Sequence, residues 1–164
     1  MSLGGMFRPG MRTYIIPLVA GTALAISVFL PWVVVSDVSL TGFPDVLALW
    51  ILGLGVLAAV LATLSLITRK NSRHPLLVIG LASLGIMFLS WRIMPASVGD
   101  RALTISQALA IVDGRPLETP PAPLVGSGIY LGLIASSALV GFGLTIVVRR
   151  VSRPYAVVEQ DDDV

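Results

Sequence analysis

The stretch VLALWILGLGVLAAVLATLSLI, residues 46–67, decides the fold class. It contains no charged residue, and it is as long as the roughly 20 apolar residues that a helix needs to cross a hydrocarbon core of about 30 Å. The whole chain shares this character, because 55% of its residues are hydrophobic and only 12% are charged. An average soluble domain carries roughly 25% charged residues. The composition therefore indicates an integral membrane protein.

Three further apolar runs lie on either side of this stretch. Two of them are long enough to cross a bilayer unaided, whereas the uncharged run at residues 76–91 is short and must borrow residues from its flanks before Pro95 ends it. We therefore expect an all-α, polytopic membrane protein with four transmembrane helices, at residues 14–35, 46–67, 75–94 and 124–148.

Basic residues are concentrated at one end of these predicted helices, which sets the expected orientation. By the positive-inside rule, both termini are cytoplasmic, namely the N-terminal segment 1–13 and the acidic tail 151–164. The overall formal charge of +2 reflects this topology, and no basic stripe suited to nucleic acid is visible. Eight of the eleven basic residues fall on the cytoplasmic side: Arg8, Arg12, Arg69, Lys70, Arg73, Arg149, Arg150 and Arg153.

The first and third predicted helices resemble each other in sequence. FLPW at residues 29–32 returns as FLSW at residues 88–91, and Leu18, Gly21 and Ala23 also recur 59 positions later. This pattern predicts a duplicated hairpin, with copies at 14–70 and 71–150 related by a rotation of about 180° about the membrane normal. The alternative is that unrelated membrane helices share a composition and their interfacial aromatic residues.

The second copy has the longer outer loop, residues 95–123. Within it, Leu103, Ile105, Leu109 and Val112 alternate with polar residues in a pattern typical of a short amphipathic helix, which Gly114 would terminate. We expect this helix to lie along the outer surface, either as a packing lid or as a docking element for a partner.

Small residues form stripes on two of the predicted helices, and such stripes let membrane helices approach closely. The stripes serve either packing within the monomer or an interface with another subunit. The residues concerned are Gly128, Gly132 and Ser136, a second pair at Ser137 and Gly141, and Gly55 with Ala59.

Two further groups of residues map to the outer membrane boundary. Trp32, Trp50, Trp91 and Tyr130 are predicted to form an aromatic belt. Arg92, next to Trp91, starts out aimed into the bilayer because helical side chains lean toward the helix N-terminus. We expect it to act as a clamp that contacts Asp37, Asp100 or the outer carbonyl groups of the first helix.

Residues that carry chemistry are scarce. The predicted spans hold no Asp, Glu, Lys or His at mid-depth, the chain has no cysteine, and its single histidine, His74, lies at the cytoplasmic edge. We therefore predict no catalytic residue, no cofactor and no metal, and a protein that is not an enzyme.

The layout, with Pro31-Trp32 closing the first helix and a glycine-rich last helix that starts with Tyr130, resembles the small bacterial four-helix integral membrane proteins of unassigned function. This resemblance implies a bacterial inner membrane. We expect an accessory or structural subunit that packs against a larger complex, with membrane lipid and other subunits or itself as partners. The alternative is a small channel or a carrier of lipid or small molecules, with a path at the repeat interface lined by Thr22, Ser27, Ser83 and Ser136.

Overall fold

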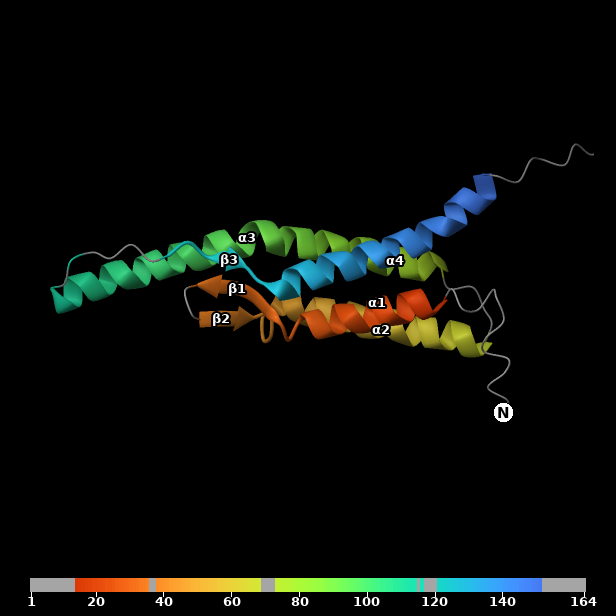
Figure 1. Cartoon of the computed structure of the whole chain (residues 1–164), viewed down its shortest axis with the longest axis horizontal. Helices are drawn as coiled ribbons and strands as arrows, with labels where there is room; N and C mark the ends of the chain where they lie inside the picture. Colours follow the sequence, from red (N-terminus) through yellow and green to blue (C-terminus); the bar gives the residue numbers. More distant parts are fainter. Residues whose placement is uncertain (1–13, 36–37, 69–72, 115, 117–120, 152–164) are drawn as a thin grey trace, which may run out of the picture.

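A computed structural model describes residues 14–35, 38–68, 73–114, 116 and 121–151 (Figure 1). The described part is mostly helical. Its helices are α1 (Ile15–Ser27), α2 (Val46–Thr68), α3 (Arg73–Asp113) and α4 (Ser127–Val151). Three short strands, β1 (Pro31–Val35), β2 (Val38–Thr41) and β3 (Leu124–Val125), gather at one end of the bundle. We call this end the sheet end.

The helices lie side by side as a bundle. Helix α1 packs against both α2 and α4, and α3 packs against α4, whereas α2 and α3 contact each other least among these neighbouring pairs. Close approach depends on glycine: a Cβ placed on Gly21 would lie 2.8 Å from the backbone nitrogen of Ala59, and one placed on Gly80 would lie 2.8 Å from that of Val140. Because real Cβ atoms do not approach backbone this closely, a side chain at either position would push the helices apart.

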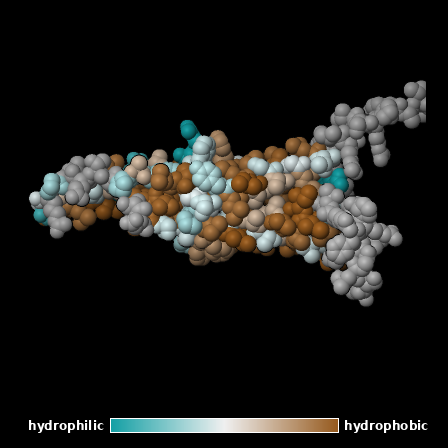
Figure 2. Space-filling model, in the orientation of Figure 1, coloured by the Kyte–Doolittle hydropathy of each residue, from teal (hydrophilic) through white to brown (hydrophobic). Residues whose placement is uncertain are grey.

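Three of the described helical segments are long and apolar enough to cross a membrane: Val46–Thr68, Arg73–Asp113 and Ser127–Thr145. Helix α1 is equally apolar but has only 13 residues. Large apolar side chains such as Val19, Leu57 and Ile134 are exposed on the bundle, and Figure 2 shows this apolar surface in brown. A surface of this kind is suited to lipid, which supports the assignment as a membrane protein by length and composition.

The sheet corrects the all-α expectation. The helix predicted at residues 14–35 ends at Ser27, and Pro31–Val35 form the central strand β1 of a sheet with the order β2-β1-β3. Both pairings are antiparallel; Val34 lies opposite Ser39 on one side and Leu124 on the other. Pro31 cannot donate a helical hydrogen bond, and three consecutive valines favour extended backbone. Apolar character alone does not distinguish such a strand from the end of a helix.

Helix α3 also departs from the prediction. It does not end before Pro95 but continues through it to Asp113, where Gly114 takes a positive φ of 62°. The amphipathic segment expected as a separate surface helix is thus the second half of α3. We call residues 96–113 the arm, and in Figure 1 it extends beyond the sheet end of the bundle. The sequence after the proline favours helix, with good helix formers at Ala102, Gln107, Ala108 and Leu109. The proline itself costs the helix one hydrogen bond and a local steric clash.

Candidate functional site

The first small-residue stripe of α4 is used inside the molecule. A Cβ on Gly128 would lie 2.6 Å from the carbonyl oxygen of Ser27, and one on Gly132 would collide with the side chain of Met87. Ser136, the third member, is fully buried. This stripe therefore brings α4 against α1 and α3.

Helix α2 uses its stripe in the same way. A Cβ on Gly55 would lie 2.7 Å from the backbone nitrogen of Ala25, and Ala59 is the close neighbour of Gly21. Both predicted residues of α2 thus lie in the interface between α1 and α2.

The second pair on α4 differs. Ser137 is exposed, and a Cβ built on Gly141 would meet nothing within 4 Å among the described residues. With Tyr130, Ile134 and Leu144 these residues recur at spacings of three and four along one side of α4, and all five are exposed. We call this side, defined by residues 130, 134, 137, 141 and 144, the open face of α4.

Trp32 does not belong to the aromatic belt. Its side chain is fully buried, and its indole Nε1–H donates a hydrogen bond of 2.9 Å to the carbonyl oxygen of Ser27. The residue lies on β1, where its ring packs against Gly42 and Gly128, so it links the sheet to the bundle. Trp50, Trp91 and Tyr130 are exposed, as a belt requires, and their place at a membrane boundary stays a prediction.

Arg92 is exposed, and no hydrogen bond or ion pair joins it to another described residue, Asp100 included. Asp100 is exposed on the same helix, two turns further on. Asp37 lies outside the described residues, so the Arg92–Asp37 contact stays a prediction.

The four hydroxyl groups considered for a membrane path all bond to carbonyl groups of their own helices. Thr22 donates to Leu18, Ser27 to Leu24 and Ser83 to Ile79, at 2.6 to 2.9 Å. Ser136 donates to Gly132 at 2.7 Å. Ser27, Ser83 and Ser136 are fully buried, and a Cβ built on Gly132 would lie 3.2 Å from the hydroxyl oxygen of Ser27. Each of these hydroxyl groups therefore gives its hydrogen to the backbone of its own helix, and a path between the repeats stays a prediction.

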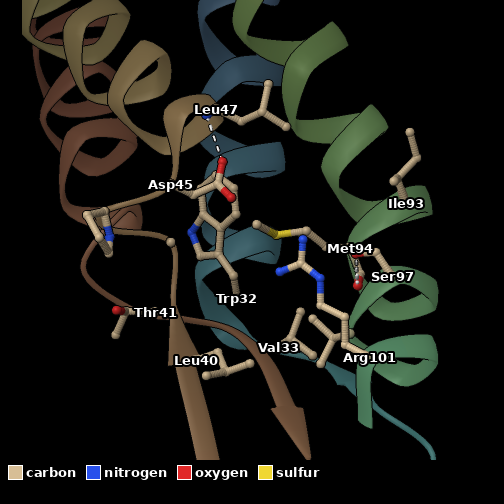
Figure 3. A pocket seen from close by; sticks show the side chains of 13 residues that line it. Trp32, Val33, Leu40, Thr41, Asp45, Leu47, Ile93, Met94, Ser97 and Arg101 are labelled. Atoms are coloured by element: carbon tan, nitrogen blue, oxygen red, sulfur yellow. Dashed lines mark hydrogen bonds between the residues drawn. The ribbon is translucent and has the colours of Figure 1, made fainter. Parts of the chain in front are cut away.

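A pocket of about 520 Å³ lies at the sheet end, between the start of α2, the β1–β2 hairpin and α3 (Figure 3). Its size is typical of small-molecule sites, which run from roughly 300 to 1,000 Å³. Apolar side chains make up most of its lining, among them Trp32, Val33, Leu40, Leu47, Ile93 and Met94.

Two charged residues border this pocket from opposite walls. Asp45 precedes α2, and its carboxylate Oδ1 accepts a hydrogen bond of 2.9 Å from the backbone N–H of Leu47, so it caps the helix as expected for its position. Arg101 comes from the arm, and in Figure 3 its side chain rises along α3 toward Met94 and the bundle. No ion pair joins the two residues, or either of them to another described residue.

Sequence reasoning did not single out Arg101. Arg101 follows Ser97 and Val98 by four and three residues, and in a helix this spacing places all three on one side. They share that side because α3 continues through Pro95. In the part of the chain that the structure describes, no three His, Cys, Asp or Glu residues lie close enough to hold a metal ion.

No protein-family model, curated protein or solved structure is significantly similar to this chain.

Proposed function

We propose that this protein is a non-enzymatic subunit of the bacterial inner membrane, which packs against another membrane protein or a second copy of itself through the open face of α4. One observation carries the proposal. The Gly128–Ser136 stripe is filled by neighbours inside the molecule, whereas the Ser137–Gly141 pair has room for another helix.

The open face has the chemistry of a helix-packing surface. Within a bilayer, burial of apolar area drives little association, because lipid chains are as apolar as leucine side chains. Small residues matter instead, since they let two backbones come close and increase their van der Waals contact. Gly141 lies on this face between Ser137 and Leu144, where it permits such an approach.

The arm provides a second surface in the same proposal. Ile105, Leu109 and Val112 recur at spacings of four and three, and between 55% and 79% of each side chain is exposed. An apolar stripe on a helix outside the hydrocarbon core favours contact with a protein partner. We therefore assign the arm a docking role rather than that of a packing lid.

The proposal includes four membrane crossings, cytoplasmic termini and a duplicated hairpin. Helix α1 runs beside α2 and α4, which supports a fourth crossing despite its short length. The duplication is supported by equivalent residues in equivalent contacts: Gly21 meets Ala58 and Ala59 on α2, and Gly80, 59 positions later, meets Leu139 and Val140 on α4. These two pairs of partners are separated by 81 positions. This separation is close to the offset of 80 at which Ala58, Val60 and Leu64 of α2 have identical counterparts, Ala138, Val140 and Leu144, in α4.

Replacement of Gly141 by leucine tests the subunit role. Gly141→Leu would occupy the space that the partner helix needs while leaving the monomer intact, because nothing lies within 4 Å of its Cβ position. The tagged protein is purified in mild detergent, and the material that co-purifies is identified and quantified by mass spectrometry. We expect at least about a tenfold loss of partner or self-association, corresponding to roughly 1.4 kcal/mol.

Gly85→Leu is the matched control. Gly85 is an equally open glycine, with nothing within 4 Å of its Cβ position, and it belongs to α3 and not to the open face of α4. Equal losses for the two variants would argue against a specific face on α4. A stable wild-type monomer with no co-purifying protein would contradict the subunit role itself.

A further inference from the structure

The pocket at the sheet end lies at the level where a bilayer would meet water. The sheet marks the far side of this boundary, because β2 is exposed along its whole length and its outer edge needs hydrogen-bond partners that a hydrocarbon core lacks. The boundary on the bundle side is marked by the start of α2 at Val46 and by Ile93 on α3, both exposed and apolar. The pocket spans these two levels.

Its position also gives access from the bilayer. The pocket draws one wall from the start of α2 and another from α3, the two neighbouring helices that contact each other least. A molecule that occupies it can therefore keep an apolar part between these helices while its polar part reaches the sheet end.

Arg101 supplies the cation at this polar level. Its Cα lies about 10 Å along the helix from that of Met94, at 1.5 Å per residue. The side chain leans back toward the N-terminus of α3, as helical side chains do, and so returns toward the bundle (Figure 3). The guanidinium group offers five donors in a planar fork that matches phosphate, and no described residue pairs with it.

Asp45 supplies a negative charge on the other wall. One carboxylate oxygen is used by the helix cap, but a carboxylate accepts several hydrogen bonds, so the second oxygen and the charge remain for a ligand. A cation on one wall and an anion on the other, above an apolar lining, complement a zwitterionic amphiphile.

We propose that this pocket binds the headgroup of an aminophospholipid such as phosphatidylethanolamine, with the phosphate on Arg101 and the primary ammonium on Asp45. The glycerol and upper acyl chains contact Ile93, Met94 and Leu47. This inference does not depend on the proposed subunit role, because neither the open face of α4 nor the apolar stripe of the arm, Ile105, Leu109 and Val112, shares a residue with the pocket. A primary ammonium donates hydrogen bonds to the carboxylate, whereas the quaternary ammonium of phosphatidylcholine has no N–H to donate.

The test measures lipid retention. The full-length protein in mild detergent is mixed with equal amounts of dioleoyl phosphatidylethanolamine and dioleoyl phosphatidylcholine, and the bound lipids are counted by native mass spectrometry. The wild type should retain phosphatidylethanolamine about tenfold better, the factor that one charge-assisted hydrogen bond contributes. Arg101→Gln should lower retention of both lipids about tenfold, and Arg101→Lys, which keeps the charge but not the fork, should fall between these values.

Asp45→Asn separates the two halves of the site. Asparagine still caps α2, so the fold is retained, but the negative charge is gone. We expect this variant to retain phosphatidylethanolamine and phosphatidylcholine about equally, while Arg101 still holds lipid in the pocket. A preference that survives this substitution would overturn the role of Asp45.

Arg92→Gln is the matched control for the phosphate contact, because Arg92 is an exposed arginine on the same helix that does not line the pocket. Equal losses for Arg92→Gln and Arg101→Gln would overturn the proposal. Soluble glycerophosphoethanolamine is added in a second arm: if it displaces the lipid at equal concentration, the site takes a free phosphate ester and the lipid assignment is wrong. Failure of Gly141→Leu to release a partner would leave these outcomes unchanged.

Discussion

Ser90 differs from the other buried serines of the bundle. Its side chain is 1% exposed, and within the described residues its hydroxyl oxygen has no hydrogen-bond partner. A buried hydroxyl without a partner loses its interaction with water and gains nothing in return. We expect Ser90→Ala to raise the free energy of unfolding by about 1 kcal/mol, measured by unfolding in mixed detergent micelles.

The comparison for Ser90→Ala is Ser83→Ala on the same helix. The Ser83 hydroxyl donates to Ile79 at 2.8 Å, so its removal should leave the unfolding free energy unchanged or lower it by roughly 0.6 kcal/mol. A lower free energy of unfolding for Ser90→Ala would contradict this expectation. It would mean that the hydroxyl group of Ser90 has a hydrogen-bond partner, such as a bound water.

The sequence predicted the role of small residues better than it predicted the burial of large ones. Gly128, Gly132 and Gly55 were expected to let helices approach closely, and each lies in a close contact, because a missing side chain has this effect whichever helix comes near. Trp32 was assigned to the membrane boundary by its place at the end of an apolar run. Trp32 is buried because its ring packs against Gly42 and Gly128, which are distant from it in the sequence. The residues next to Trp32 in the chain therefore could not predict its burial.

Among the elements, the middle of each apolar run was predicted well and the ends less well. Helix α2 was expected at 46–67 and is found at Val46–Thr68, because Pro44 and Asp45 mark its start clearly. The ends of α1 and α3 depend on whether apolar or amphipathic sequence beyond a proline forms strand or helix. Tertiary pairing with β2 and β3 decides this for Pro31–Val35. The pocket could not be predicted, since Asp45, Trp32 and Arg101 come from segments that only the fold brings together.

Pro95 interrupts the hydrogen bonding of α3 at the base of the arm. It lies inside α3, where it has no N–H to bond the carbonyl group of Trp91. Pro95→Ala would restore this hydrogen bond and stabilise the helix locally by up to about 3 kcal/mol. Amide hydrogen exchange should therefore slow in residues 96–101, at the base of the arm.

Residues near the middle of α2 provide the internal reference for Pro95→Ala, because their exchange should not change. Unchanged exchange at 96–101 as well would mean that the proline does not limit the stability of the arm, and that the arm opens by fraying from Asp113.

The two ends of the bundle differ in structure. One end carries the sheet, the pocket and the arm; at the other, α2 ends at Thr68 and α3 begins at Arg73. Arg73 begins α3, and Arg149 and Arg150 belong to the last turn of α4; in the sequence, Arg69 and Lys70 lie between α2 and α3. The positive-inside rule thus places the sheet end outside the cytoplasm in the proposed topology. An exposed pocket on the outer leaflet and a docking arm beyond it both depend on this orientation.

The absence of cysteine makes this topology directly measurable. Ile105→Cys and His74→Cys each introduce a single thiol at an exposed position, the first on the arm and the second beside the start of α3. A membrane-impermeant maleimide applied to intact spheroplasts should label Ile105→Cys, and it should label His74→Cys only after permeabilisation. The opposite labelling pattern would show that the protein has the reverse orientation in the membrane. Labelling of both positions in intact spheroplasts would contradict a bundle that crosses the bilayer, since the two thiols lie some 30 residues apart on one helix, a distance of about 46 Å that exceeds the hydrocarbon core.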